Sequence, residues 1–306
     1  MSEAVIVRAP GKINLALSVG PLAADGYHPL ATVFLAVGLY EYVAAEPADT
    51  LSLEFDPTSP IPVAELPTDE SNLVIRAATL LAETTGHRAG ARLRVKKYVP
   101  VAGGMGGGSA DAAATLVACN ELWGTNLTRT DLESLAAQLG SDVPFALSGG
   151  AAIGTGRGDQ LARTLVGGEL HWVLRFNHLG ISTPAAYRAL DEHREKFADH
   201  LGPTSDPEID PALLQALRTG DVRALAPQLT NDLQAPALRM RPELTAALAA
   251  GEHAGALTGI VSGSGPTLAF LARDAHDAAA IAERLRGAGH SVAQVTSPAE
   301  GAARCC

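Results

Sequence analysis

Lysine, aromatic residues and cysteine are all scarce in this chain of 306 residues. Only four lysines occur, at positions 12, 96, 97 and 196, and aromatic residues make up 4% of the sequence. Because arginine carries most of the positive charge, a lysine or an aromatic residue inside a motif is more informative here than usual. No apolar run approaches the length of a membrane-spanning helix, and the first residues lack the basic and apolar segments of a secretion signal. We therefore expect a cytoplasmic protein.

The three cysteines do not form the pattern of a disulfide-stabilised fold. Cys119 lies within a predicted helix, and Cys305 and Cys306 are the last two residues. A terminal pair of cysteines can be a prenylation signal, but nothing else in the sequence indicates a membrane anchor. We interpret the pair as part of a frayed tail.

Positive charge is also in short supply, since the formal net charge at pH 7 is −10. This balance argues against a nucleic-acid-binding surface. An anionic small-molecule substrate would have to be attracted by local groups and not by the overall field. We expect a monomer or a weak homodimer that acts on a small molecule and binds neither nucleic acid nor membrane.

The chain is rich in apolar residues, which make up 47% of it, against 18% charged residues. This is the composition of a compact protein, and 306 residues exceed the usual size of a single core. We expect two domains, at residues 1–155 and 156–306. Strands dominate the beginning, and helices alternate with strands near the end, so the predicted class is α+β.

Apolar periodicity and turn residues place the elements along the chain. Thr130 and Glu133 have the spacing of a capping box at the start of a helix. The polar, proline-rich segment from Lys196 to Pro211 is interpreted as a surface excursion. The expected strands are 4–8, 13–19, 31–37, 42–45, 91–99, 151–153, 170–176, 256–261, 267–271 and 291–295. The expected helices are 72–85, 109–123, 130–139, 184–195, 212–217, 221–229, 242–250 and 275–286.

The stretch from Pro100 to Asp111 carries the strongest functional signal, because it places five glycines between a predicted strand and a predicted helix. A loop with so few side chains can close its backbone N–H groups around an anion. The N-terminus of the following helix adds unpaired N–H groups and the positive end of a dipole. A polyphosphate is the natural ligand of such a loop, whereas a flexible linker would not be bounded so sharply by a strand and a helix.

The common phosphate-loop motifs do not fit this stretch. A Walker A motif requires lysine before the final serine, and Gly108 precedes Ser109 here. The dinucleotide motif that would start at Gly104 requires glycine where Ser109 stands. The tripeptides His-Arg-Asp and Asp-Phe-Gly of protein kinases do not occur in the chain.

The glycine loop resembles the phosphate loop of the GHMP small-molecule kinases, the superfamily of galactose, homoserine, mevalonate and phosphomevalonate kinases. Three further motifs occur in matching order, at Pro10–Leu15, Asp25–His28 and Leu139–Pro144. The first two are most similar to the branch that phosphorylates the 2-hydroxyl of cytidine-diphospho-methylerythritol in the non-mevalonate isoprenoid pathway. The resemblance implies a ribosomal-protein-S5-like ATP-binding domain followed by a ferredoxin-like α+β domain, with the active site between them.

The resemblance also implies which residues hold ATP and Mg²⁺. Asn72 and Lys97 match positions near the adenine, and Ser109 is expected beside the metal, although its hydroxyl could instead only cap the helix. One departure is Asp111, where related kinases often have an uncharged residue, and we expect it to point away from the triphosphate. The loop residues expected to hold the triphosphate are Pro100, Val101, Ala102, Gly103, Gly104, Met105, Gly106, Gly107, Gly108, Ser109 and Ala110.

Two residues match the catalytic positions of the family. Asp142 is implied as the general base, although its spacing alone favours a turn cap ahead of Pro144. Lys12 matches the active-site lysine, which would keep the carboxylate ionised and offset charge on the transferred phosphoryl group. The alternative for Lys12 is a solvated lysine at a strand end. The turn at Ser262–Gly265 matches a further superfamily motif but could be a plain hairpin turn.

Four residues match positions that bind the alcohol substrate. Asn14 lies two residues after Lys12, so both side chains would face the same side of a strand. Tyr27 is expected to stack on the cytosine and His28 to hydrogen bond with it. Tyr187 is expected on the other face of the base, although a helix residue packed in a core would look the same. A kinase for homoserine or mevalonate, whose substrates have no base to stack, and a silent nucleotide-binding protein of this fold are the remaining alternatives.

Overall fold

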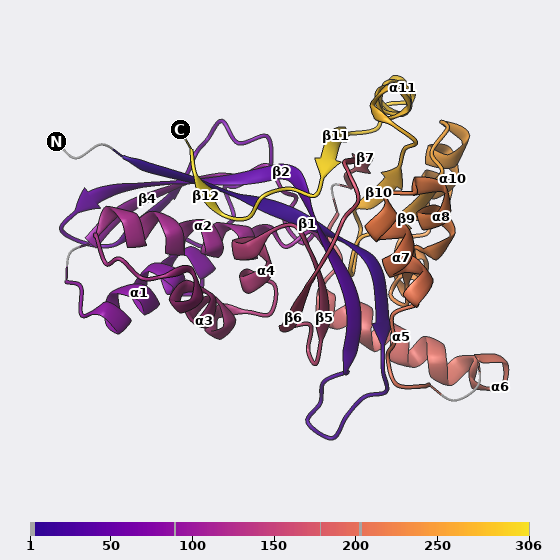
Figure 1. The fold of residues 1–306 in the computed structure, drawn as a ribbon, viewed down its shortest axis with the longest axis horizontal. Helices are drawn as coiled ribbons and strands as arrows, with labels where there is room; N and C mark the ends of the chain where they lie inside the picture. Colours follow the sequence, from indigo (N-terminus) through magenta and orange to yellow (C-terminus); the bar gives the residue numbers. More distant parts are fainter. Residues whose placement is uncertain (1–3, 89, 178, 202–203, 306) are drawn as a thin grey trace.

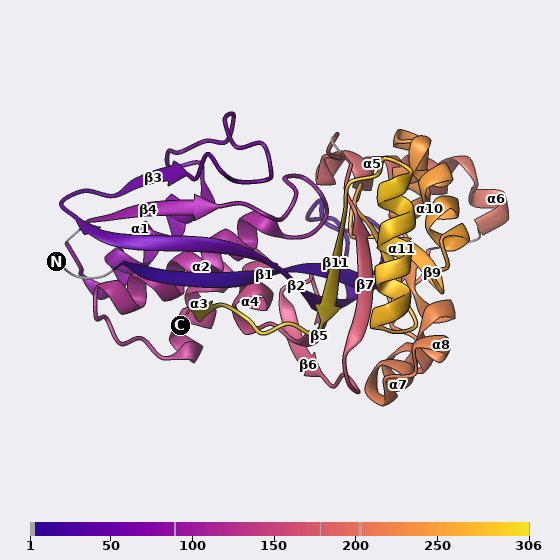
Figure 2. The same cartoon turned by 90° about the horizontal axis from the view of Figure 1, so that it is seen from above.

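The computed structural model describes residues 4–88, 90–177, 179–201 and 204–305 and shows two lobes side by side along the long axis (Figures 1 and 2). The first lobe is organised by a long antiparallel hairpin, β1 (Val5–Val19) and β2 (Leu30–Ala48). Both strands run from the outer end of the first lobe to the boundary with the second lobe (Figure 1). The hairpin thus carries residues of the first lobe into the interface between the lobes.

The sheet of the first lobe has the strand order β12-β1-β2-β4-β3, and β5, β6 and β8 join it beside this path. Its pairs are antiparallel except β3 with β4 and β8 with β1. The remaining strands of this sheet are β3 (Ser52–Phe55), β4 (Gly90–Lys96), β5 (Ala151–Thr155), β6 (Gln160–Thr164), β8 (Thr230–Asn231) and β12 (Ala303–Arg304).

Four helices cover one face of this sheet (Figure 1). They are α1 (Leu73–Thr85), α2 (Gly107–Leu122), α3 (Arg129–Leu139) and α4 (Val143–Ser148). Helix α2 packs against β1, β2, α1 and α4, and its face toward them consists mainly of buried alanines. Small side chains let a helix approach a sheet closely, so α2 brings the glycine loop before it down to the sheet.

The second lobe is built on an antiparallel sheet of order β11-β7-β10-β9, with helices packed against it. Its strands are β7 (Leu170–Arg175), β9 (Thr258–Val261), β10 (Leu268–Leu271) and β11 (Val292–Ser297). The helices of this half are α5 (Thr183–Lys196), α6 (Ala198–Leu201), α7 (Pro211–Thr219), α8 (Val222–Leu225), the 3₁₀ turn Ala226–Gln228, α9 (Gln234–Met240), α10 (Glu243–His253) and α11 (Ala275–Gly287). The α+β class is confirmed.

The sequence predicts breaks in both long strands, and these predictions are wrong. Strand β1 continues through Pro10, and β2 continues through Leu39. The pairing register shifts between Pro10 and Gly11, so the residues of β2 around Leu39 bulge out of the ladder. A β-bulge accommodates the extra residues of β2 opposite Pro10 and Gly11, so neither strand ends there.

The capping box of α3 lies two residues before the predicted one. Thr128 is the N-cap, its hydroxyl accepts from the Asp131 N–H at 3.2 Å, and the Asp131 carboxylate accepts from the Thr128 N–H at 2.9 Å. The prediction of Thr130 with Glu133 is wrong because the Thr-x-x-acid pattern occurs twice, and Thr128 is the residue with the extended backbone of a cap.

The proposed boundary between residues 155 and 156 stays a prediction. It falls between β5 and β6, which pair with each other in the first sheet. After β11 the chain crosses back to the first lobe, where β12 pairs with β1 (Figure 1). The segment from Lys196 to Pro211 contains α6 in the second lobe, and its residues 202–203 lie outside the described part, as does Cys306.

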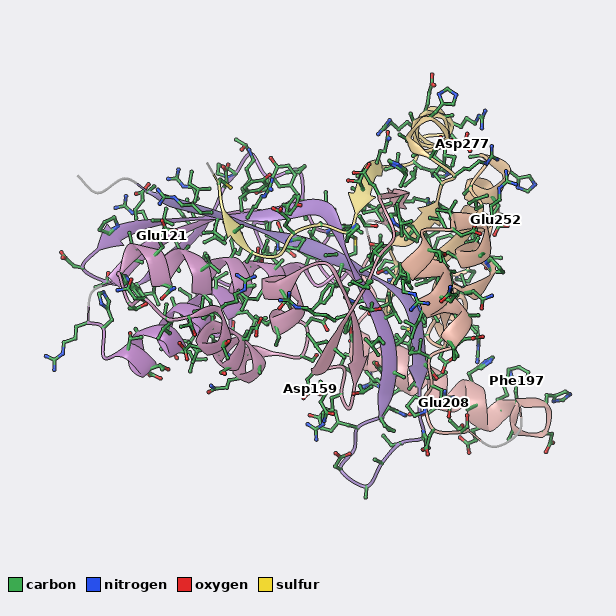
Figure 3. The ribbon with its side chains drawn as sticks, viewed as in Figure 1. Glu121, Asp159, Phe197, Glu208, Glu252 and Asp277 are labelled. Atoms are coloured by element: carbon green, nitrogen blue, oxygen red, sulfur yellow. The ribbon has the colours of Figure 1, made fainter. Side chains whose placement is uncertain are left out.

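Several acidic side chains are exposed and widely separated over both lobes, among them Glu121, Glu208 and Glu252 (Figure 3). The negative charge is therefore spread over the exterior. An anionic substrate would then have to be attracted by groups within its binding site. Within the part of the chain that the structure describes, no helix combines the length and apolarity needed to cross a membrane.

Candidate active site

A cleft of about 1180 Å³ lies where the two lobes meet. Its walls come from β1, the glycine loop, the start of α4, the β1–β2 connection and α5. Both catalytic candidates line this cleft, and so do the residues predicted to bind ATP or substrate, with two exceptions. The exceptions are Ser109 and Ala110. Motifs that are far apart in the sequence are thus brought to one cavity.

The glycine loop adopts backbone conformations that need glycine. Gly104 and Gly106 have φ angles of 76° and 70°, and a Cβ atom on Gly104 would come within 2.0 Å of the Ser262 carbonyl oxygen. The backbone N–H of Lys12 donates to the Met105 carbonyl at 3.0 Å, which fixes the loop to β1. A side chain at Gly104 would therefore displace the loop from the cleft wall.

Helix α2 begins at Gly107, two residues before the predicted start, and Gly106 is its N-cap without a side-chain hydrogen bond. The interpretation of Ser109 as the cap is therefore wrong. Ser109 lies in the first turn and is partly buried. The first turn leaves N–H groups without intrahelical partners at the cleft, as an anion site requires.

Lys12 and Asn14 face the same side of β1, as predicted. The Lys12 ammonium donates to the Asn14 Oδ1 at 2.7 Å, and the Asn14 Nδ2 donates to the Thr32 Oγ1 at 2.7 Å. The Thr32 hydroxyl in turn donates to the Ala16 carbonyl at 2.7 Å. This chain of donors fixes the Asn14 amide with its oxygen toward Lys12. The interpretation of Lys12 as a solvated strand-end residue is wrong, since it is 8% exposed.

Asp142 lies opposite this lysine, with 3.8 Å between its Oδ2 and the Lys12 Nζ. It precedes α4 as the N-cap residue, but its side chain makes no capping hydrogen bond. Asp142 thus holds the cap position without a capping side-chain hydrogen bond, and it lines the cleft. A Cβ atom on Gly106 would meet Lys12 at 3.3 Å and the Asp142 Oδ2 at 3.7 Å, so both groups border the glycine loop.

The electrostatics of this pair follow from burial. Burial lowers the pKa of Lys12, and the nearby Asp142 carboxylate opposes that shift. Burial, and to a lesser extent Asp142, raises the pKa of the Tyr187 phenol to about 12. Tyr187 therefore stays neutral at physiological pH.

The aromatic end of the cleft is formed by Tyr27, His28 and Tyr187. His28 and Tyr187 are stacked on each other, with ring centroids 5.4 Å apart and an angle of 24° between the planes. Tyr27 is 54% exposed, and the Arg157 guanidinium lies 3.7 Å from its ring centroid. Arg157 also pairs with Asp25 at 3.0 Å, which anchors it over the tyrosine.

Both ring nitrogens of His28 have partners. Nδ1 lies 2.9 Å from the Gly20 carbonyl oxygen, and Nε2 lies 3.3 Å from the Asp191 Oδ2. Because a carbonyl oxygen only accepts, Nδ1 is the donor in the first contact. The predicted hydrogen bond from the His28 side chain to a base would require one of these two contacts to be given up.

Lys97 is buried in a cluster with two acids. Its ammonium contacts the Glu41 Oε1 and the Asp111 Oδ2, each at 2.5 Å, and all three side chains are at most 7% exposed. Burial works against the charged form of Lys97, but Asp111 and Glu41 together raise its pKa. Burial, then the neighbouring Asp111, raises the pKa of Glu41 to about 8, and burial raises that of Asp111. The ammonium is thus committed to these carboxylates.

Asn72, the other residue expected near the adenine, is the N-cap of α1. Its Oδ1 accepts from the Val74 N–H at 2.9 Å, and its Nδ2 donates to the Pro67 carbonyl at 2.7 Å. Asn72 and Lys97 line the cleft but use these side-chain groups to hold the fold. Their contact with a nucleotide stays a prediction.

Sequence reasoning missed Glu41, Arg157, Arg188 and Asp191. Asp191 lies four residues after Tyr187 on α5, so helical spacing could have placed both side chains on the same face of the helix. Arg157 lies in a Gly-Arg-Gly turn, and Arg188 is an exposed residue at the cleft without an ion-pair partner among the described residues. Glu41 gives no sequence signal, because only the fold brings it to Lys97.

Comparisons with known proteins agree with this geometry. Residues 72–150 match the family "GHMP kinases N terminal domain", and residues 213–291 match "GHMP kinases C terminal". The chain is 54% identical over 301 residues to the 4-diphosphocytidyl-2-C-methyl-D-erythritol kinase of Leifsonia xyli subsp. xyli, with 98% of each chain covered.

Solved structures show the same relationship. A crystal structure of 4-(cytidine 5′-diphospho)-2C-methyl-D-erythritol kinase is 33% identical, covers 96% of this chain and 98% of its own, and superposes with a TM-score of 0.76. The homoserine kinase of Cytophaga hutchinsonii is 20% identical with a TM-score of 0.73, over 100% of this chain and 98% of its own. The second likeness shows the shared fold.

Proposed function

Because the chain belongs to the GHMP kinases, and among them to the 4-diphosphocytidyl-2-C-methyl-D-erythritol kinases, we propose that its cleft transfers the γ-phosphoryl group of ATP to the 2-hydroxyl of 4-(cytidine 5′-diphospho)-2-C-methyl-D-erythritol. The products are the 2-phosphate and ADP. The observation that carries this proposal is the placement of Lys12 and Asp142 against Gly106 of the glycine loop. This arrangement supports the proposal, because a phosphate bound to the loop would have a carboxylate and a lysine side chain beside it.

The glycine loop and the first turn of α2 provide the ATP end. The residues from Pro100 to Gly108 line the cleft, and Gly104 and Gly106 have positive φ angles that few other residues adopt. Backbone N–H groups there can surround phosphate oxygens, and the dipole of α2 favours their negative charge. Asn72 and Lys97, at the same end, would contact the adenine side through their backbone or through rearranged side chains.

Asp142 is the proposed general base. It would accept the proton of the 2-hydroxyl as the oxygen forms a bond to the γ-phosphorus and the bond to the β,γ-bridging oxygen of ATP breaks. A hydroxyl on a carbon that also bears a methyl group is hindered, so orientation matters as much as basicity. Asn14 can orient the hydroxyl, and Lys12 can offset charge on the transferred phosphoryl group.

Tyr27, Tyr187 and His28 would bind the cytosine. Base stacking on aromatic rings is worth about 1–3 kcal/mol per base. Between this end and the catalytic pair, the diphosphate of the substrate needs cations, because the protein as a whole is negatively charged. Arg157 and Arg188 line the same cleft and can supply them as hydrogen-bonding guanidinium groups.

Mg²⁺ supplies charge neutralisation of the phosphates when it is bound as the ATP complex. The donor set here offers it few protein ligands: the described residues contain no group of three or more His, Cys, Asp or Glu side chains arranged to hold a metal. Ser109, in the first turn of α2, is the proposed hydroxyl on the metal side. The phosphates and water would provide most of the remaining ligands.

The test is ADP release by the purified protein with Mg²⁺ and ATP, in which the cytidine compound is offered beside homoserine, mevalonate and galactose. Turnover with the cytidine compound alone is expected. Turnover with another alcohol would contradict the assignment of the aromatic end, and ATP binding without any turnover would indicate a silent nucleotide-binding protein. A cytoplasmic location and a monomeric or weakly dimeric state stay predictions beside this test.

A further inference from the structure

Two adjacent residues, Asn231 and Asp232, connect three parts of the cleft without lining it. They follow one another at β8, the short strand that pairs in parallel with β1. The Asp232 N–H also donates to the Leu17 carbonyl at 2.9 Å, so the backbone of this pair is fixed to β1. From this point the two side chains reach different elements.

Asn231 holds the glycine turn at Ser262–Gly265. Its Nδ2 donates to the carbonyls of Val261 and Gly263, both at 2.8 Å, and its Oδ1 accepts from the Leu233 N–H at 2.9 Å. Every hydrogen-bonding position of the amide toward the turn is therefore used, and an aspartate of the same shape would lack both donors.

The turn that Asn231 holds lies in close contact with the catalytic end of the cleft. A Cβ atom on Gly263 would lie 3.2 Å from the Lys12 Nζ and 3.2 Å from the Asn14 Oδ1. The Ser262 hydroxyl donates to the Gly104 carbonyl at 3.1 Å, and the Thr267 N–H donates to the Gly103 carbonyl at 3.3 Å. The turn is thus not a plain hairpin turn, because it supports both Lys12 and the phosphate loop.

Asp232 acts toward the substrate end. Its Oδ2 accepts from the Val19 N–H at 2.8 Å and from the Arg194 Nη2 at 3.1 Å. Arg194, on α5, also donates to the carbonyls of Val19 at 2.5 Å and Gly20 at 3.1 Å. The Gly20 carbonyl is the same oxygen that accepts from the His28 Nδ1. Asp232 therefore orients Arg194, and Arg194 in turn holds the Gly20 carbonyl to which His28 is hydrogen bonded.

We propose that Asn231 and Asp232 are positioning residues that act on separate parts of the reaction. Asn231 keeps Lys12, Asn14 and the phosphate loop in register for phosphoryl transfer. Asp232, through Arg194 and Gly20, keeps His28 in place for binding of the cytidine substrate. This proposal rests on the proposed function, because it assigns the two effects to the ATP end and the cytidine end of that same cleft.

The test compares Asn231→Asp with Asp232→Asn in steady-state kinetics with ATP and the cytidine substrate. Asn231→Asp should lower kcat about 10²-fold with little change in the KM for the cytidine substrate, since small misplacement of reacting groups has effects of this size. Asp232→Asn should raise that KM about tenfold or more with little change in kcat. The reason is that it removes the charge of the carboxylate that accepts from Arg194 and from the Val19 N–H. Asp232→Glu keeps a carboxylate at this position and should therefore raise the KM less than Asp232→Asn does.

Matched controls separate positioning from stability. Asn120→Asp removes a side-chain amide that bridges to Leu127, and Asp210→Asn changes the N-cap of α7. Both should leave kcat and KM unchanged. If Asn231→Asp fails to fold, Asn231→Ser keeps one donor and should show a smaller loss of kcat.

Equal changes in kcat and KM for the two variants, or a change in melting temperature alone, would overturn the proposal. Wild-type turnover is measured in the same assay. An inactive wild-type protein would contradict the proposed function, whereas an active one whose variants show no split would contradict only the positioning roles.

Discussion

Two lysine–carboxylate clusters border the same cleft, and they differ in nearly every property. Lys12 lies 3.8 Å from Asp142, whose side chain is 28% exposed, and burial lowers the pKa of the lysine. Lys97 lies 2.5 Å from each of two buried carboxyl groups, those of Glu41 and Asp111, and these acids raise its pKa against the effect of burial. The first cluster is open toward the cleft, whereas the second is closed by its own contacts.

The difference indicates which cluster performs chemistry. An ammonium without a close carboxylate partner can respond to charge that develops on a transferred phosphoryl group. An ammonium that two buried carboxyl groups already hold at 2.5 Å cannot, and its removal would leave both acids buried without their cation. We therefore propose that Lys12 and Asp142 act in turnover, whereas Lys97 with Glu41 and Asp111 supports the packing of β2, β4 and α2.

Replacement of the closed lysine should have the largest effect on stability. Lys97→Met leaves Glu41 and Asp111 buried without a cation, so we expect the free energy of unfolding to fall by about 3–5 kcal/mol. Urea denaturation followed by circular dichroism measures this. Lys96→Met, at the last residue of β4 and directly before Lys97, is the matched control and should change stability by less than about 1 kcal/mol. A change of that small size in Lys97→Met would contradict the structural role.

Replacement of the open lysine should affect turnover instead. Lys12→Met should lower kcat about 10²–10³-fold, because it removes charge stabilisation of the transferred group. The free energy of unfolding should change by no more than about 1 kcal/mol, since Asp142 remains partly exposed. Initial rates and urea denaturation of the same preparation test both parts. A loss of stability equal to that of Lys97→Met would erase the distinction between the clusters.

The aromatic end sharpens the comparison, because Tyr187 lies close enough to Asp142 for the carboxylate to affect its pKa. Tyr187→Leu should raise the KM for the cytidine substrate by an amount equivalent to about 1–3 kcal/mol of lost stacking. Tyr187→Phe keeps the ring and should bind nearly as well as the wild type. If the phenylalanine variant loses as much as the leucine variant, the hydroxyl and not the stacking face is what matters.

A further effect concerns pH, because the protonation of Glu41 changes within one pH range while the packing stays the same. Burial raises the pKa of Glu41 to about 8 in the folded protein, against an ordinary value of 4.5. The stability that its protonated form contributes is complete below pH 4.5 and is lost as the pH rises through 8. Glu41→Gln should flatten this fall in the free energy of unfolding. Parallel slopes for the variant and the wild type would show that Glu41 does not titrate in this range.

The sequence predicted the parts of this site that reside in contiguous motifs. The glycine loop and the shared strand face of Lys12 and Asn14 follow from local rules of backbone and side-chain geometry. The predicted start of α1 at residue 72 is one residue from the observed start at Leu73. The continuity of β1 through Pro10 did not follow, because a bulge depends on the partner strand.

The contacts between distant elements could not be predicted from one sequence. Nothing in the neighbourhood of Glu41 indicates that it lies against Lys97, and nothing near Asn231 indicates the turn at Gly263. These contacts arise from the packing of strands and helices that are more than thirty residues apart, and they decide which lysine is free. The contacts of Lys97 with Glu41 and Asp111 are therefore visible in the fold and not in the sequence around Lys97.

The most direct test of the account compares two aspartate variants, Asp142→Asn and Asp111→Asn, for kcat and for the free energy of unfolding. Asp142→Asn should lower kcat about 10²–10⁴-fold, as loss of a general base does, with ATP affinity and stability close to those of the wild type. Asp111→Asn should lower stability while the folded fraction keeps its kcat. The reverse pattern, or equal losses of kcat in both variants, would contradict the division between a working and a supporting cluster.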